Sequence, residues 1–499
     1  MDDTTNLDHP TEGLTMCDTV AVAGRPPLTA ALARSRWTAL AVLCTGMLMI
    51  VLDATVVNVA LPAIQADLGF SQAGLAWVVN AYLIAFGGLL LLAGRLGDLI
   101  SRRGVFLTGL VVFTIASLAC GLAQSQEVLV AARFVQGVGG AMTSAVILGM
   151  IVTLFPEPRE RAKAIGFYAF VASAGGSIGL LAGGVLTQAI SWHWIFFINI
   201  PVGVATGVLG RRLLDKDTGP GFGHGADVVG AALITAALVA GIYTIVEPAA
   251  KQGWGAGQTL GLGATSVALL IAFVIREATA RNPLIPLRIF RSRAVTGANL
   301  IQALAIGGLF GMFFLGVLYV QQVLGYDALD TGLAYLPTTL VMGTMSMRYA
   351  DRLITRYGAW WTLVPGLLLV AAGLILFARV PVDGSYLVDI LPSMILIGIG
   401  VGVCFPALMT LAMSGATAHD AGLASGLVNT SAEVGAAVGL AVLATLSAAR
   451  TEDLLGRGLP PQQALTEGYH AGFWAAAVLI VLALLVAAGV LRPDRVSAR

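Results

Sequence analysis

Fourteen long apolar stretches separated by short polar segments constrain this chain more than any other feature. Most of them approach or exceed the roughly 20 residues that a helix needs to cross the hydrocarbon core of a bilayer. Apolar residues make up 57% of the chain and charged residues only 11%, against about 25% charged residues in soluble domains. We therefore predict an all-α polytopic membrane protein with spans near residues 37–61, 73–93, 105–123, 128–153, 162–187, 194–210, 227–247, 259–275, 296–322, 331–347, 360–378, 388–413, 422–447 and 471–491.

The placement of basic residues predicts the orientation of these spans. If the N-terminus is cytoplasmic, 23 of the 28 Lys and Arg residues fall in cytoplasmic segments, four fall in outer loops, and Arg133 lies within a span. This asymmetry is the one that the positive-inside rule describes, and removing a single span would destroy it. The sequence predicts 14 transmembrane helices with both termini cytoplasmic.

Two internal echoes divide the spans into related halves. One is a charged loop around Asp98 that reappears, one residue longer, around Asp351; the other is a set of three glycines repeated at a constant spacing, namely Gly166, Gly175, Gly179 and Gly426, Gly435, Gly439. Many transporters are built from such repeats. The predicted 6+2+6 organisation is a cytoplasmic disordered tail at 1–36, six-helix bundles at 37–212 and 295–492, an inserted two-span linker with a cytoplasmic loop at 213–294, and a cytoplasmic tail at 493–499.

The loop at 94–104 is a short charged segment between two apolar runs, rich in Gly and Asp residues that end helices. It and its echo both fall on the predicted cytoplasmic side. Asp98 and its arginines are suited to cap a neighbouring helix and pair charges, so we expect a gate that latches the two halves. Topology signalling alone is the alternative role of the arginines. The expected gating residues are Gly94, Arg95, Gly97, Asp98, Arg102, Arg103, Gly104, Asp351, Arg352 and Arg356.

Several motifs resemble those of a known family. The loop at 94–104 is similar to the signature of the major facilitator superfamily between its second and third spans, and 133–140 is similar to its fourth-span motif. The segments 52–62 and 192–203 are more specific and resemble the fourteen-span drug/proton antiporters of bacteria. The resemblance covers about 37–491. It implies the major facilitator fold, a bacterial cytoplasmic membrane, and proton-coupled export of small lipophilic or amphipathic drugs or antibiotics by alternating access.

The fifth predicted span resembles the motif that marks the antiporters of this family. The family usually has proline after the glycine at 179, whereas this chain has Leu180, so the kink that proline gives is not expected. A glycine at every fourth position makes a smooth strip along which a neighbouring helix can pack or slide. Close packing without a role in coupling is the alternative. The motif glycines are Gly175, Gly176, Gly179, Gly183 and Gly184.

Two opposite charges are predicted to meet inside the membrane. Counting about 1.5 Å per residue, Asp53 and Arg133 both lie roughly 9 to 12 Å below the outer boundary, so the two side chains can face each other. A carboxylate within a span is by default functional because burying it is costly. We interpret Asp53 as the residue that binds the transported proton, with Arg133 favouring release. A static ion pair between two helices is the alternative.

Glu433 is the second carboxylate predicted to lie deep within a span, near the middle of the thirteenth. A structural carboxylate there would need a basic partner, and Arg133 is the only basic residue placed inside a span. We expect Glu433 to bind a proton or a cation. A neutral, hydrogen-bonded acid in the core is the alternative.

Polar residues of the first, second, fourth, ninth and thirteenth spans are candidates for lining a central cavity with apolar walls. Interhelical hydrogen bonding is the alternative for each of them. The candidates are Asn58, Asn80, Tyr82, Gln136, Asn299, Gln302, Tyr319, Gln321, Gln322 and Asn429.

Motifs for phosphate loops, metal-binding helices and clustered histidines are missing from the sequence, so we expect no enzyme activity, no cofactor and no metal. The near-neutral net charge of +1 gives no basis for nucleic-acid binding. We expect a monomer whose partners are a small-molecule substrate, protons and the lipid bilayer. Because a fold does not fix function, a facilitator or exporter of an endogenous metabolite or lipid-like compound, or a non-coupled membrane sensor, is the alternative.

Overall fold

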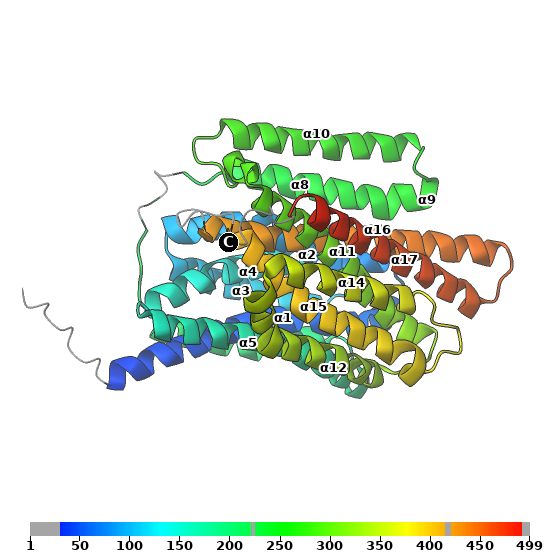
Figure 1. Cartoon of the computed structure of the whole chain (residues 1–499), viewed down its shortest axis with the longest axis horizontal. Helices are drawn as coiled ribbons and strands as arrows, with labels where there is room; N and C mark the ends of the chain where they lie inside the picture. Colours follow the sequence, from blue (N-terminus) through cyan, green and yellow to red (C-terminus); the bar gives the residue numbers. More distant parts are fainter. Residues whose placement is uncertain (1–29, 220, 222–224, 415–420, 492–499) are drawn as a thin grey trace, which may run out of the picture.

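The structure, a computed structural model, describes residues 30–219, 221, 225–414 and 421–491. These residues form helices joined by short loops, without a β-strand among them (Figure 1). Helix is the expected outcome for apolar spans, because only a helix or a closed barrel satisfies the backbone hydrogen bonds within a bilayer. The all-α prediction is confirmed. The predicted tails fall largely outside the described residues, but helix already begins at Ala30, before the predicted first span.

The first bundle contains six spans, the sixth of which is divided between two helices. Ser101 and Ser125 cap two of its helices by accepting a hydrogen bond from the backbone three residues on. The elements are α1 (Ala30–Leu68), η1 (Gly74–Ala76), α2 (Trp77–Leu99), α3 (Arg102–Gly121), α4 (Gln126–Leu154), α5 (Pro158–Ala189), α6 (Trp194–Phe197) and α7 (Asn199–Leu213). α5 runs without a break from Pro158 to Ala189.

The inserted pair and the second bundle follow. The pair is α8 (Val228–Thr244) with η3 (Ile245–Ala249), α9 (Ala250–Gln252) and α10 (Gly257–Thr279), and a short η4 (Leu287–Arg291) leads onward. The second bundle comprises α11 (Arg293–Gln322), α12 (Ala328–Thr344) with η5 (Met345–Ala350), α13 (Asp351–Tyr357), α14 (Ala359–Phe377), η6 (Tyr386–Ile390) with α15 (Leu391–Ser414), α16 (Ala421–Gly456) and α17 (Pro461–Gly489).

Each predicted span corresponds to a helix, but one of them is less membrane-like than the others. Within the described residues, 13 helices are long and apolar enough to cross a membrane. The remaining one, α12, is expected at 331–347 and packs between α5 and α15: Gly332 lies against Leu180 of α5, and Gly398 of α15 lies against Thr338. Together with η5 it continues to Ala350, so it is long enough to span the bilayer.

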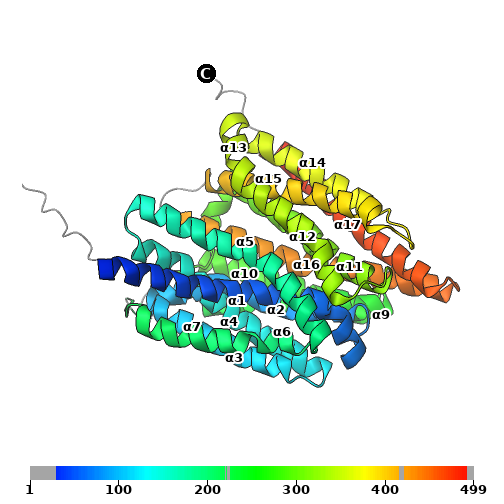
Figure 2. The same ribbon diagram turned by 90° about the horizontal axis from the view of Figure 1, so that it is seen from below.

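The two bundles lie side by side, with the inserted pair along one edge (Figures 1 and 2). The repeated glycines occupy equivalent places in both. In the first bundle Gly175 and Gly179 bring α5 against Val51 and Thr55 of α1, and in the second their counterparts Gly435 and Gly439 bring α16 against Ala303 and Gly307 of α11, whereas Gly166 meets no neighbour among the described residues. The glycine echo in the sequence therefore corresponds to one repeated close helix contact.

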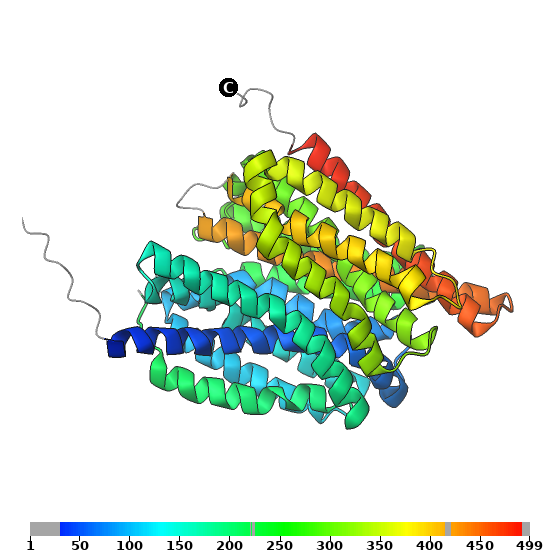
Figure 3. The ribbon, with the colours of Figure 1, turned by 60° about the horizontal axis from the view of Figure 1, so that its bottom comes forward.

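The bundles are joined at their outer ends. The Gln188 amide of α5 donates to Asp327 at 2.7 Å, Gln321 donates to the Val59 carbonyl at 3.0 Å, and Gln322 donates to Gln65 at 2.8 Å. Among the described residues, every hydrogen bond between the two bundles lies at this end, where α5 and α12 converge (Figure 3). These contacts, which we call the outer seal, hold the two bundles together at their outer ends in this conformation.

Candidate proton and substrate site

Asp53 of α1 and Arg133 of α4 form a fully buried ion pair. Their side chains are 0% and 1% exposed, and Arg133 Nη1 lies 2.5 Å from Asp53 Oδ2. The structure therefore brings together the two charges that sequence counting placed at one depth. Because burial strips water from both groups, such a pair is retained only with good geometry and further hydrogen bonds.

Those further bonds come from two amides and a backbone carbonyl. Gln136 Nε2 and Asn199 Nδ2 donate to Asp53 Oδ1 at 2.7 and 3.0 Å. Arg133 Nε donates to the carbonyl of Val78 at 2.9 Å, and Nη1 also donates to Gln136 Oε1 at 2.7 Å. The Arg133 guanidinium additionally lies 4.5 Å from the centre of the Tyr82 ring. Four helices, α1, α2, α4 and α7, thus meet at this ion pair.

Glycines on α4 make this convergence possible. A Cβ atom at Gly139 would meet the backbone of Phe113 in α3 at 2.5 Å, and one at Gly140 would meet the Tyr82 hydroxyl at 2.9 Å. A Cβ atom at Gly137 would lie 2.4 Å from the carbonyl oxygen of Tyr82 in α2. The glycine-rich segment after Arg133 therefore lets α2 and α3 approach α4 closely enough to enclose Arg133 and Gln136.

Two members of this cluster were missed from the sequence. Asn199 begins α7 and donates to Asp53, and Ser117 of α3 accepts a hydrogen bond from Gln136 Nε2 at 2.7 Å. Both are polar residues in or beside apolar spans, which is a usable signal. The sequence gives no indication of which of many such residues converge, because that depends on how the helices rotate.

Glu433 lies on α16 at the contact between the two bundles. A Cβ atom at Gly87 of α2 would lie 2.7 Å from the Glu433 Cβ. Glu433 forms no ion pair or hydrogen bond with another residue in the described part of the chain, and it is partly exposed. Gly87 follows Tyr82 by little more than one turn of α2, so this one helix touches both the Asp53 cluster and Glu433.

The expected cavity-lining residues fall into three groups: those in α2 and α4, those within α1, α11 and α16, and those at the outer end of α11. Asn80 and Tyr82 of α2 are buried, and the Asn80 amide and the Tyr82 hydroxyl lack hydrogen-bond partners among the described residues. Gln136 belongs to the Asp53 cluster. Asn58 and Asn299 donate to carbonyls of their own helices, and Asn299 also accepts from Ser431 at 2.9 Å, whereas Gln302 is partly buried and Asn429 is exposed.

The third group lies at the outer end of α11 and not around a central cavity. The Tyr319 hydroxyl donates to the carbonyl of Pro381 in an outer loop at 2.7 Å. Gln321 and Gln322 bond to α1 across the outer seal. These three positions face outward because α11 ends at Gln322, so the polar side chains of its last turn meet the neighbouring loop and helix.

The charged segment at 94–104 is bonded within the first bundle. The expectation that it is a loop is wrong: α2 continues to Leu99 and α3 begins at Arg102, so only Ile100 and Ser101 lie outside a helix. Asp98 Oδ1 lies 2.9 Å from Nε and Nη2 of Arg102, and Arg102 Nη1 donates to the carbonyl of Gly149 in α4 at 3.3 Å. Its echo lies elsewhere: Asp351 begins α13, and Arg356 lies over the ring of Tyr357. The expected latch between the two segments is therefore not formed in this conformation, among the residues described.

Asp217, in the loop after α7, is the residue that fastens this segment. Its carboxylate accepts hydrogen bonds from the Ser101 hydroxyl and the Arg102 backbone, both at 2.6 Å, and from the Arg103 backbone at 3.2 Å. Partial burial favours a raised pKa, but these hydrogen bonds prevail and lower the pKa of Asp217 below its usual value. The first turn of α3 is thus held by an anion at its N-terminus.

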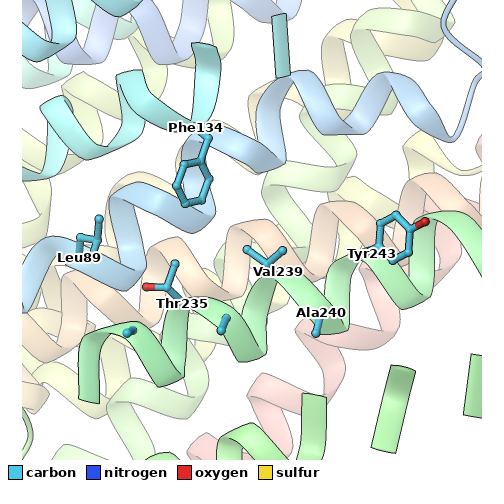
Figure 4. A pocket seen from close by; sticks show the side chains of 8 residues that line it. Leu89, Phe134, Thr235, Val239, Ala240 and Tyr243 are labelled. Atoms are coloured by element: carbon cyan, nitrogen blue, oxygen red, sulfur yellow. The ribbon is translucent and has the colours of Figure 1, made fainter. Parts of the chain in front are cut away.

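A membrane-facing hollow of about 530 Å³ lies between the first bundle and the inserted pair. Figure 4 shows Phe134 of α4 directed toward Thr235 and Val239 of α8. The walls of this hollow are almost entirely apolar, so the hydrocarbon chains of lipids can pack against them. The hollow is separate from the Asp53 cluster, none of whose residues line it.

Comparison with known proteins places this geometry in context. Residues 43–440 match the sequence profile of the Major Facilitator Superfamily. The chain is 39% identical over 455 residues to the puromycin resistance protein pur8 of Streptomyces alboniger, covering 91% of this chain and 90% of that protein. It is also 39% identical over 417 residues to the cephamycin export protein CmcT of Amycolatopsis lactamdurans, covering 83% and 85%.

A solved structure of similar fold is that of a bacterial homologue of the human lysosomal transporter Spinster. The TM-score is 0.65 at 17% identity, and the match covers 92% of this chain and 99% of that one. At this identity the likeness concerns the fold alone. It extends over both bundles.

Proposed function

The chain belongs to the major facilitator superfamily and spans the inner membrane of a bacterium many times, and from this premise we propose that it is a proton-coupled antiporter. Its cargo would be small lipophilic or amphipathic antibiotics, exported by alternating access. Its relatives include resistance or export proteins for puromycin, cephamycin and tetracenomycin C, which are 39%, 39% and 34% identical to it over the aligned residues. The proposal thus concerns the coupling ion and the class of cargo, not the family.

The observation that carries the proposal is the buried Asp53 carboxylate. Both of its oxygens accept hydrogen bonds, from one cationic and two neutral donors, an arrangement complementary to the ionised carboxylate. The outer seal is formed in this conformation, so the arrangement fits a step in which the proton has already left toward the cytoplasm. Reopening to the outside would pull α1, α4 or α7 apart and let a proton replace Arg133.

Glu433 and the segment at 94–104 have separate roles in this proposal. Glu433 has no basic partner among the residues that the structure describes, so it offers a charge to a proton or to a cationic cargo at the contact between the bundles. The segment, held by Asp98–Arg102 and Asp217, stiffens the cytoplasmic end of the first bundle as the two bundles rock. Close glycine contacts between α1 and α5 let those helices move as one unit.

Purified protein in vesicles tests the coupling. Compounds that release protons from the protein would first be identified, with puromycin among those tried, and their transport driven by an imposed pH gradient. Asp53→Asn is expected to abolish gradient-driven transport while leaving substrate binding and downhill exchange measurable. Glu127→Gln, at an exposed carboxylate on α4, serves as the control and is expected to transport normally. If the Asp53→Asn variant still transports substrate against its gradient, the Asp53–Arg133 ion pair has only a structural role.

A further inference from the structure

A second, larger hollow lies on the membrane face of the first bundle, between α3 and α7 and the loop that follows α7. Its volume is about 930 Å³. It extends along α3 from Ser101 to Ile115, about 21 Å at 1.5 Å per residue. One leaflet is half of the roughly 30 Å hydrocarbon core, and the groove is longer than that. The groove therefore extends from the cytoplasmic interface past the middle of the inner leaflet.

The deeper part of the groove is apolar and open to lipid. Val111 and Ile115 of α3 are 55% and 63% exposed, and Val204 and Val208 of α7 face the same space with about half of their surface exposed. Gly203 and Gly207 lie between them, and a Cβ atom at Gly207 would meet nothing within 4 Å. The groove therefore has room for a hydrocarbon chain along its floor.

The cytoplasmic end of the groove is basic. Arg103, Arg211 and Lys216 line it, and the only carboxylate among its lining residues is Asp217. Asp217 already accepts three hydrogen bonds from Ser101, Arg102 and Arg103. Arg103 Nη2 donates to the carbonyl of Arg211, whereas Arg103 Nε is buried without a partner among the described residues. The Arg211 and Lys216 side chains form no ion pair within the described part of the chain. Unpaired donors thus converge where the groove reaches the interface.

We propose that this groove binds an anionic phospholipid of the inner leaflet. The headgroup phosphate would accept hydrogen bonds from Arg103, Arg211 and Lys216, and one acyl chain would lie along Gly207 between α3 and α7. Charge complementarity selects an anionic lipid, because a zwitterionic headgroup brings an ammonium group toward the same three cations. The lipid would also brace the first turn of α3, through Arg103, within the segment at 94–104.

Native mass spectrometry of the full-length protein in detergent tests this site. The probes are phosphatidylglycerol and phosphatidylcholine with identical acyl chains, and the readout is the affinity of the first bound lipid. Wild type is expected to prefer phosphatidylglycerol by roughly tenfold or more, since each basic residue contributes about a factor of five. Arg211→Gln combined with Lys216→Gln should reduce this preference to near unity, and Gly207→Leu should weaken binding of both lipids by filling the groove.

Matched controls separate the groove from general surface charge. Arg159→Gln combined with Arg161→Gln removes two cytoplasmic charges of the same bundle that do not line the groove, and is expected to keep the preference. Equal binding of the two lipids by wild type, an undiminished preference in the Arg211/Lys216 variant, or displacement of the lipid by millimolar inorganic phosphate would each overturn the proposal. None of these measurements depends on transport.

Discussion

At the scale of single residues, the two carboxylates within the spans have opposite surroundings. Asp53 is enclosed by donors from three other residues, whereas Glu433 has no partner among the described residues and lies against the bare backbone of Gly87. A carboxylate that already has a cation is poorly placed to attract another, and an unpaired one is well placed. The two acids are therefore expected to respond differently to neutralisation.

Glu433→Gln removes a negative charge while keeping the shape of the side chain. Transport of cationic compounds is expected to fall about tenfold, the factor that corresponds to losing roughly 1.4 kcal/mol of attraction, while neutral compounds are unaffected. Vesicle transport of matched cationic and neutral substrates measures the ratio. Glu452→Gln, an exposed position on the same helix, is the control. An unchanged ratio would identify Glu433 as a neutral core acid.

At the scale of elements, the contact between α1 and α5 depends on glycines at defined positions. Gly183 faces the backbone carbonyl of Val56, and a Cβ atom there would lie only 2.7 Å from it. Gly176, one position from Gly175 in the sequence, points elsewhere and would meet nothing within 4 Å. The predicted smooth strip thus includes Gly175, Gly179 and Gly183, whereas Gly176 and Gly184 lie outside it, the latter against Ala328 of α12.

Gly183→Ala is expected to destabilise the protein by about 1 to 3 kcal/mol, because the backbone of α1 must move away from the added methyl group. Thermal unfolding of the purified protein in detergent would detect this as a lower Tm, and transport would slow with it. Gly176→Ala provides the matched comparison and should leave Tm within about a degree or two, since exposed substitutions have small effects. Equal effects of both changes would argue against tight packing at Gly183.

At the scale of the whole molecule, a few polar contacts at the outer ends decide which side of the protein is closed. The Gln188 amide bonds to Asp327 and accepts from the backbone of Leu329, so one side chain joins α5 to α12. Gln321 and Gln322 add two more bonds to α1. Such bonds contribute only about 1 kcal/mol each, which suits a seal that must open in every cycle.

Gln188→Glu places a second carboxylate beside Asp327 and is expected to weaken the seal. A cysteine introduced at Asn58, below the seal on α1, should then react several times faster with a membrane-impermeant maleimide added outside, in line with a shift of about 1 kcal/mol. Gln188→Met, which removes the bond without adding charge, should produce a smaller increase. Labelling no faster than in the parent would mean that other contacts hold the outer end closed.

Much of this architecture could be predicted from the sequence. The parts that could not be predicted concern particular residues. Span positions and orientation follow from apolar length and arginine placement, and the partnership of Asp53 with Arg133 follows from counting residues along two helices. Asn199, Ser117 and Asp217 were not found, because the rotation and placement of the packed helices and loops decide which polar residues meet. Tyr319, Gln321 and Gln322 were expected around a cavity and lie in or beside the outer seal.

The sequence by itself determined that the chain crosses a membrane repeatedly, which side its charged loops occupy, and which family it resembles, because hydrophobic length and charge act locally on each segment. Tertiary structure alone decided which polar residues surround Asp53, that Glu433 has no described partner, and that a basic-ended groove lies between α3 and α7. Those features depend on the rotation and spacing of packed helices, and fractions of an ångström at glycine contacts set both.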